Sequence, residues 1–308
     1  LMSIDMYTKG KIKTGDYVDA SNVDLVKDLL DPIQYTNLKE QGRRIKIVPT
    51  TLDITQMYNQ DHLEATLRNK GRATWSADGN LVADNGENWL GGVPFPEPKD
   101  AKEALANITM SWGRHNFSIY AIPEISLRPD GTVGYDREFI WAELQCQARA
   151  DGKVFQGNDE LLRLQSIWFT RPNDTKGSSF LSVWYYDQRK FPDLYGYFPA
   201  FKRVRQFPTN QRFEPVVPGM TFFLSDAWSS GDPMLTWGDY KMITRKPHLA
   251  PMSENWQGDS PNWDKKVHGG DQGLTFYETN FQLVPECVVM VIRPTLTGEP
   301  SSIRHDRS

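Results

Sequence analysis

The sequence predicts an α+β protein whose main element is an antiparallel sheet covered by helices. Short strand-like segments follow one another and are joined by tight turns such as Asp130-Gly131 and Asp151-Gly152, a pattern typical of antiparallel hairpins. Residues 139–149 alternate apolar and polar side chains with the period of a strand. Residues 100–112 carry apolar side chains at helical spacing. That helix is the best candidate to pack across the sheet.

The first hundred residues are predicted to contain most of the helices. Residues 1–20 show no periodicity and are interpreted as an extended arm. Asp31-Pro32 separates two short helices, because Pro32 is suited to the first turn of the second one. The further elements expected here are a helix over residues 53–69, a hairpin over 75–82 and a rigid, proline-rich linker over 91–98.

From residue 117 onwards the pattern is strand after strand. In residues 139–149 one face carries Ile140, Ala142 and Leu144, whereas the other carries Glu143 and Gln145. The remaining strands are expected at residues 117–127, 161–170, 183–186, 198–205, 220–224, 240–244 and 274–292.

The stretch at residues 180–206 gathers aromatic and basic side chains in two strands joined by a loop with Pro192 and Gly196. Trp184 and Tyr186 share a strand face by period 2, and we expect this face to line an apolar cavity. Arg203 and Arg205 are expected on the convex or rim side, where arginines are usually solvated. Such a rim could also meet an acidic partner or a lipid headgroup.

Composition excludes several function classes. The 308 residues include 35 Lys+Arg and 39 Asp+Glu, which gives a net charge of −4. The chain therefore lacks the basic excess that would indicate nucleic-acid binding. The sequence contains no run of 18 apolar residues, so it predicts no membrane-spanning helix. Aromatic residues make up 12% of the chain. Because β-sheet cores also favour large rings, these residues are either ordinary core or the lining of a ligand cavity.

The sequence contains no catalytic or metal-binding motif. The five histidines are scattered, and neither a nucleophile elbow, a P-loop nor a dinucleotide-binding glycine pattern is present. We therefore expect no enzyme activity, no metal and no cofactor. Cys146 and Cys287 lack the spacing of a metal site, and the sequence leaves open whether they are free thiols or form a disulfide.

Three motifs, in order, resemble a known family. The segment 197–205, YFPAFKRVR, is similar to a strand of bacterial outer-membrane lipoprotein-sorting-like proteins, and 221–228, TFFLSDAW, is similar to the segment that follows it in that group. The segment 89–98, WLGGVPFPEP, resembles the signature of one branch, the proteins of unknown function called DUF 1329. The resemblance spans about residues 48–294 and implies a LolA/LolB-like fold, a strongly curved antiparallel sheet that forms a half-open barrel.

The resemblance implies a non-catalytic periplasmic carrier or chaperone for a lipid, an acyl chain or a sterol-like molecule, linked to outer-membrane proteins or RND-type transporters. It also implies an exported protein whose signal peptide is absent from this sequence, and similar proteins continue into a further strand segment beyond Ile303. One domain is expected overall, with an arm and short helices over residues 1–50 and the sheet domain over 51–308. The candidate cavity residues are Trp141, Trp168, Trp184, Tyr186, Phe198, Phe222, Trp228 and Trp237.

Two rival functions are weighed against the carrier. The first is a structural or interaction subunit of an envelope complex, whose core is filled by its own side chains. The second is a hydrolase of hydrophobic esters, against which the missing nucleophile motif argues. The exposed loop tryptophans Trp256 and Trp263 could alternatively stack on sugar rings, although no lectin motif accompanies them.

Overall fold

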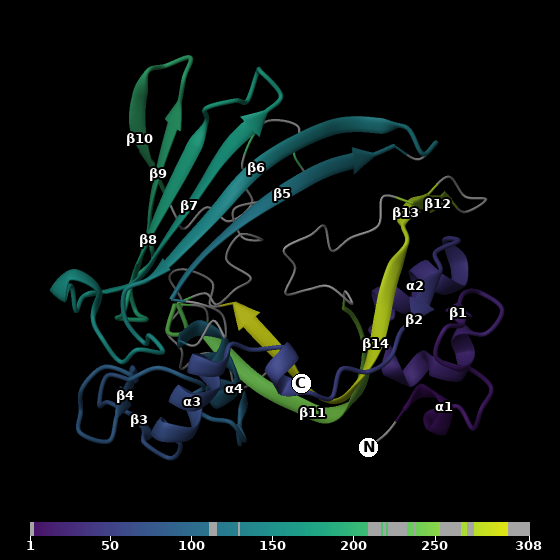
Figure 1. Ribbon diagram of the computed structural model, residues 1–308, viewed down its shortest axis with the longest axis horizontal. Helices are drawn as coiled ribbons and strands as arrows, with labels where there is room; N and C mark the ends of the chain where they lie inside the picture. Colours follow the sequence, from purple (N-terminus) through teal and green to yellow (C-terminus); the bar gives the residue numbers. More distant parts are fainter. Residues whose placement is uncertain are drawn as a thin grey trace, which may run out of the picture. The chain divides into compact units, whose positions relative to one another are not determined.

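The protein is α+β, with mostly antiparallel sheets and few helices, and its chain divides into two compact units. The computed structural model describes residues 3–110, 116–128, 130–208, 217, 220, 233–236, 238–252, 266–269 and 274–294. The first unit comprises Leu1–Met57, Ile125–Asp136 and Ile243–Val289, and the second comprises Tyr58–Glu124, Arg137–Met242 and Met290–Ser308. Figure 1 labels the helices and strands of both units.

The first unit is built on a small sheet with the strand order β1-β2-β14-β11. Its strands are β1 (Tyr17–Val18), β2 (Ile45–Ile47), β14 (Thr279–Pro294) and β11 (Gly238–Pro251). The pairing of β1 with β2 is antiparallel, whereas β14 runs parallel to β2. A separate hairpin pairs β12 (Val267–Gly269) with β13 (Thr275–Tyr277).

Short helices complete the first unit: α1 (Ile4–Tyr7), a 3₁₀ helix at Val23–Leu29 and α2 (Pro32–Glu40), followed by a 3₁₀ turn at Ile54–Gln56. Pro32 begins α2, as the sequence predicts, and the carboxylate of Asp31 caps the helix by accepting bonds from the amides of Ile33 and Gln34. Residues 1–20 are not a free arm, because Ile4, Ile12 and Val18 are buried in the core of this unit.

The second unit contains a six-stranded sheet with the order β10-β9-β8-β7-β6-β5. Its strands are β5 (Phe117–Leu127), β6 (Val133–Gln145), β7 (Leu161–Arg171), β8 (Ser179–Tyr185), β9 (Asp193–Phe198) and β10 (Arg203–Phe207). The pairings from β6 to β10 are antiparallel, and each joins strands adjacent in sequence. None of the sheets in the described part of the chain closes on itself, so the predicted half-open barrel stays a prediction.

Two helices and a small hairpin accompany this sheet. They are α3 (Gln60–Asn69), α4 (Ala101–Met110), β3 (Ala73–Trp75) and β4 (Leu81–Ala83). Met110, at the end of α4, packs in one cluster with Leu162 and Trp184 of the sheet, so α4 covers part of the sheet as expected. The helix predicted over residues 53–69 is instead a 3₁₀ turn followed by α3.

A glycine pair ties the linker to its surroundings. Gly91 and Gly92 have φ angles of +98° and +77°, a region that only glycine adopts without strain. A Cβ at Gly91 would lie 2.0 Å from the carbonyl oxygen of Arg149, and one at Gly92 would lie 2.3 Å from the amide nitrogen of Thr66. The Asn69 side chain donates to the Gly91 carbonyl at 2.9 Å. The linker is therefore closely packed on both sides.

The alternation predicted in residues 139–149 exists, but the buried face is the more polar one. β6 ends at Gln145, and Ala148 adopts a φ of +53° in the turn that follows. Glu143 and Gln145 are buried with Phe139, whereas Ile140, Ala142 and Leu144 are half-buried. Glu143 on this face is bonded to Trp141 and to Gln165, which offsets part of the cost of burying its carboxylate.

Candidate functional site

One face of the six-stranded sheet collects aromatic and aliphatic side chains, and we call it the aromatic face. The register places Phe139 opposite Phe169, and Trp141 opposite Ile167. Ile167 in turn lies opposite Phe180 on β8. Since partners in an antiparallel register point to the same side, the face continues across the sheet. Its residues are Phe139, Trp141, Ile167, Phe169, Phe180, Leu194, Phe198 and Phe207.

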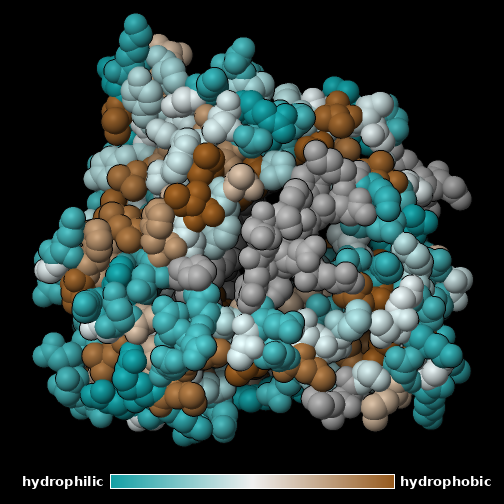
Figure 2. Space-filling view, in the orientation of Figure 1, coloured by the Kyte–Doolittle hydropathy of each residue, from teal (hydrophilic) through white to brown (hydrophobic). Residues whose placement is uncertain are grey.

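The outer members of the aromatic face are not fully covered. Phe139, Phe169 and Phe180 are buried, but Trp141, Phe198 and Phe207 are only partly buried. Phe180 makes an edge contact with Phe198 at a centroid distance of 5.6 Å. Figure 2 shows hydrophobic side chains among hydrophilic ones over the left of the view, where Figure 1 places the six-stranded sheet. The face therefore offers apolar surface beyond its buried core.

Gly196 on β9 makes the close ring packing possible. A Cβ at this position would lie 2.6 Å from the ring of Phe207 and 3.2 Å from the ring of Phe180. Any side chain here would push the two rings apart. The sequence signal for this role was a lone glycine between Tyr195 and Tyr197, which also fits a turn.

A row of buried polar side chains continues the same face beyond the rings. The Oε1 atom of Glu143 accepts bonds of 2.8 Å from Trp141 Nε1 and from Gln165 Nε2. Gln165 in turn accepts a bond of 3.2 Å from Trp184 Nε1. These bonds offset part of the cost of burying the row. It also holds the two indole rings in fixed orientations.

Trp184 and Tyr186 are brought together, as predicted, but in a packed cluster. They share it with Leu81, Trp89, Met110 and Leu162, and they are 1% and 5% exposed. The Tyr186 hydroxyl donates to the carbonyl of Leu81 at 2.9 Å and accepts from the Trp89 amide at 2.5 Å. Burial raises the pKa of this hydroxyl well above its usual range. Whether this face lines a cavity stays a prediction.

The other predicted site residues fall in different places. Trp168 is partly buried and lies opposite Ile140, which puts it on the sheet face away from Trp141. Arg203 and Arg205 are exposed on β10, which borders the described sheet, as a rim position requires. They nevertheless lie opposite Phe198 and Gly196, on the side of the aromatic face. Phe222, Trp228 and Trp237 lie outside the described residues.

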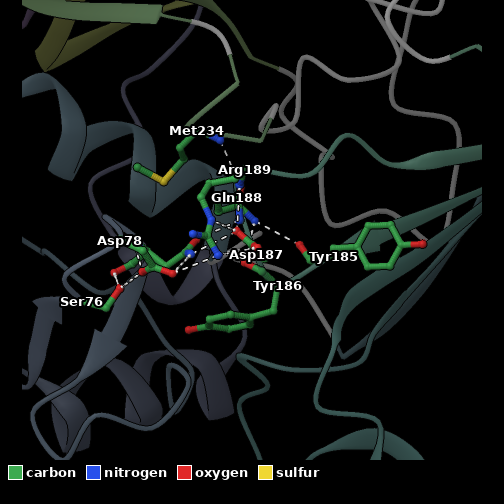
Figure 3. A network of polar contacts seen from close by, with 9 residues as sticks. Ser76, Asp78, Tyr185, Tyr186, Asp187, Gln188, Arg189 and Met234 are labelled. Carbon is green, nitrogen blue, oxygen red and sulfur yellow. Dashed lines mark hydrogen bonds and ion pairs between the residues drawn. The ribbon is translucent and has the colours of Figure 1, made fainter.

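A polar pocket of about 310 Å³ opens beside Tyr186. Figure 3 shows the network that forms one wall of it, from the β3–β4 turn and the segment after β8. The lining residues are Ser76, Asp78, Asn80, Val82, Asn88, Asp159, Glu160, Tyr186, Asp187, Arg189 and Lys190. This pocket is not the apolar cavity that the sequence predicts, because most of its lining is polar or charged.

Arg189 organises the charges of this pocket. Its guanidinium bonds both oxygens of Asp187 at 2.8 Å and forms an ion pair of 3.0 Å with Asp78. The bonds from Arg189 hold the pKa of Asp187 far below its usual range, with a further bond from Asn80 acting in the same direction. Asp78 also has a lowered pKa, chiefly because the Ser76 hydroxyl donates to it.

Gln188 holds the segment after β8 in place through hydrogen bonds to its backbone and to Met234. Its Nε2 donates to the carbonyls of Tyr185 and Tyr186, and its Oε1 accepts a bond of 3.1 Å from the Met234 amide. Sequence reasoning missed this pocket. The signal that could have indicated it was the Asp-Gln-Arg run at 187–189 together with the Asp-Gly turn at 78–79, since Asp and Asn commonly bond nearby backbone in turns.

Both cysteines are free thiols, Cys146 buried and Cys287 partly buried. This answers the question that the sequence left open. Burial raises the pKa of both thiols, and for Cys287 the neighbouring Glu286 adds to the effect. Within the described residues, no group of three or more His, Cys, Asp or Glu side chains could hold a metal ion. No helix among those residues is long and apolar enough to cross a membrane.

Comparisons with known proteins point to one family. Two crystal structures are similar to the chain: a DUF1329 family protein from Desulfovibrio piger, at 20% identity and a TM-score of 0.33, and a proposed outer membrane lipoprotein-sorting protein domain from Vibrio parahaemolyticus, at 16% identity and a TM-score of 0.35. The matches cover 46% and 63% of this chain, and this chain spans only 52% and 59% of theirs.

No curated protein matches the chain. The model of the family DUF1329, a protein family of unknown function, matches residues 17–286. This match includes the β9–β10 motif and the glycine pair on which the sequence resemblance depends. The chain therefore belongs to the DUF1329 family.

Proposed function

We propose that this protein is a non-catalytic carrier or chaperone of the periplasm that binds a hydrophobic ligand against the aromatic face. The observation that supports the proposal is the partial exposure of Trp141, Phe198 and Phe207 beside a fully packed aromatic core. The half-covered rings lie on either side of the buried core of this face, Trp141 on β6 and Phe198 and Phe207 on β9 and β10, and exposed apolar surface of this kind favours a binding role. The ligand classes that fit are lipids, acyl chains and sterol-like molecules.

Binding would proceed by burial of apolar surface. Each Å² of ligand surface removed from water contributes ~25 cal/mol, offset by the cost of ordering the ligand and the side chains. An acyl chain lying along the rings from β6 to β10 would cover the side chains that are now half-exposed. The finer fold proposal, a LolA/LolB-like half-open barrel with helices over its mouth, would curve this face around such a chain.

The cavity proposal is made for Trp141 and Phe198. Trp184 and Tyr186 pack in the adjoining cluster, and Trp168 lies on the opposite face of the sheet. The proposal also links the carrier to outer-membrane proteins or RND-type transporters, in keeping with the lipoprotein-sorting-like resemblance of residues 197–205. That no chemistry is performed is part of the proposal and rests on the sequence, which has no nucleophile or metal motif.

A matched pair of variants tests which face binds the ligand. Trp141 and Trp168 lie on the neighbouring strands β6 and β7, both partly buried, on opposite faces. The Trp141→Gln variant should bind a fluorescent fatty acid about tenfold more weakly, since about 55 Å² of lost ring contact corresponds to about 1.4 kcal/mol. The Trp168→Gln variant should bind within about twofold of the parent protein.

The measurement is a fluorescence titration beside a urea unfolding curve for each variant. Equal losses of affinity for both variants, or a parent protein that takes up no lipid, contradict the proposal. Native mass spectrometry after gentle extraction adds an independent readout, because a carrier should retain a reproducible lipid of defined mass.

The rival proposal, a structural subunit with a side-chain-filled core, is favoured by one observation. Trp184 and Tyr186 are buried by protein side chains and have bonded polar atoms, as ordinary core residues do. The mass-spectrometric experiment separates the two proposals. A stable protein partner without any retained lipid supports the subunit.

A further inference from the structure

The hairpin of β9 and β10 ends in an exposed tip. Phe198 pairs with Arg203, and the four residues between them form a turn in which the amides of Phe201 and Lys202 bond to the carbonyl of Phe198. Lys202 adopts a φ of +48° to close this turn. Residues 199–206 are all exposed. In the described part of the chain, β10 pairs only with β9 and therefore borders the sheet.

Three cations surround the tip. Lys202, Arg203 and Arg205 are exposed, and within the described residues none of them forms an ion pair. The sequence has no acidic residue between Asp193 and Glu214. The positive charge here contrasts with the net charge of −4 for the whole chain. The three cations therefore form a local positive cluster, and such a cluster favours an anionic partner.

The same tip carries exposed apolar side chains. Phe201 is 55% exposed and Val204 is 62% exposed, and Pro199 and Ala200 lie beside Phe201 in the turn. The guanidinium of Arg205 lies 4.8 Å from the centroid of the Phe201 ring. Figure 2 shows hydrophobic and hydrophilic side chains side by side over the upper left of the view, where Figure 1 places this hairpin.

We propose that the β9–β10 hairpin docks the protein on an anionic lipid surface. The exposed ring at the tip would enter the boundary between headgroups and acyl chains, while Lys202, Arg203 and Arg205 bind lipid phosphates. Aromatic rings next to basic residues are the combination that favours the membrane interface. An acidic protein segment would use the cations, but it would leave the exposed apolar turn at Pro199–Phe201 uncovered.

This docking does not depend on the carrier proposal. It concerns residues on the sheet border, and co-sedimentation measures attachment of the protein to the vesicle rather than removal of a lipid from it. A carrier that docks on a membrane would be placed to load or release a lipid there. A structural subunit could use the same tip to remain at the membrane.

The experiment is co-sedimentation of the full chain with vesicles of phosphatidylglycerol and phosphatidylcholine, against vesicles of phosphatidylcholine alone. The parent protein should bind the anionic vesicles at low salt and release from them as salt is raised, because screening weakens surface charge contacts. The Arg203→Ala/Arg205→Ala variant should bind about 25-fold more weakly, at about fivefold for each cation. Phe201→Ala should weaken binding about tenfold.

Two control variants keep the test specific. Lys11→Ala/Lys13→Ala removes two exposed cations of the other unit, so it changes the net charge equally and should leave vesicle binding unchanged. Arg203→Lys/Arg205→Lys preserves the charge and should bind within about twofold of the parent protein.

The proposal is overturned if the parent protein ignores anionic vesicles at low salt. It is also overturned if the two double-alanine variants lose affinity equally, since general charge would then explain the binding. Binding to a soluble acidic peptide with the same loss in Arg203→Ala/Arg205→Ala, together with no vesicle binding, would assign the tip to a protein partner instead.

Discussion

The guanidinium of Arg163 lies 4.5 Å from the centroid of the Trp184 ring, with both side chains almost fully buried. Arg163 also donates to the carbonyl of Thr109, near the end of α4, at 3.2 Å. A buried cation is costly unless aromatic and carbonyl groups replace its water. The ring contact makes Trp184 a partner of a buried charge. The bond from Arg163 to Thr109 links the sheet to α4.

Replacing Trp184 should therefore carry the cost of a filled core site. Trp184→Ala is expected to lower the free energy of unfolding by about 3–5 kcal/mol, with an added cost for Arg163 when its ring partner is lost. Trp168→Ala, on the half-buried opposite face, should cost clearly less. Urea unfolding monitored by far-ultraviolet circular dichroism measures both. A small loss at Trp184 would support the alternative that this ring borders a void.

The glycine pair gives a second stability prediction. Gly92→Ala should lower the free energy of unfolding by about 3 kcal/mol or more, because the new Cβ meets the backbone of α3 at 2.3 Å and the residue must keep a positive φ. Gly86→Ala is the matched control, since Gly86 has a φ of +82° and nothing within 4 Å of a Cβ. Its expected cost is about 1 kcal/mol. Equal costs would show that backbone strain alone matters.

Acid should lower the stability of the folded protein by protonating Asp187 in the polar pocket. The pKa of Asp187 in the folded chain is below its value in the unfolded chain, so its contribution to stability is complete above the unfolded value of about 3.9 and is lost as the pH falls below it. The parent protein should thus lose more stability between about pH 5 and about pH 3 than Asp187→Asn does. The control Asp159→Asn should follow the parent protein. A parallel decline in all three would contradict the prediction.

The two thiols should react slowly and at different rates. Cys146 is only 2% exposed, and burial raises the pKa of both thiols, which lowers the thiolate fraction that reacts. We expect labelling of the partly buried Cys287 first and of Cys146 only when denaturant is added. Mass spectrometry of the protein treated with a maleimide resolves the two steps. Fewer than two labels in denaturant without reductant would contradict free thiols.

The antiparallel meander and the helix before it could be predicted from the sequence, because hairpin turns and strand alternation are local signals. Which face of β6 is buried could not. Ile140 and Leu144 were the apolar choice, yet Glu143 and Gln145 are inside, and Glu143 is bonded to Trp141 on its own strand and to Gln165 on β7. A sequence shows the alternation but not the bonds that make a buried carboxylate acceptable.

The candidate site was predictable only in part. The concentration of rings in residues 180–206 indicated the aromatic face, and Trp184 and Tyr186 do meet there. Trp168 lies on the face away from Trp141 because its register partner is Ile140. Sequence shows which residues of one strand share a face, but not how neighbouring strands align. The polar pocket was missed because Asp78 and Asp187 are far apart in sequence and meet through Arg189.

The chain passes between its two units five times, at 57/58, 124/125, 136/137, 242/243 and 289/290. Strands β5, β6, β11 and β14 each continue from one unit into the other. Neither unit is therefore a contiguous piece of the gene, and no truncation can deliver one of them alone. Shuffling by recombination would have to move both units together.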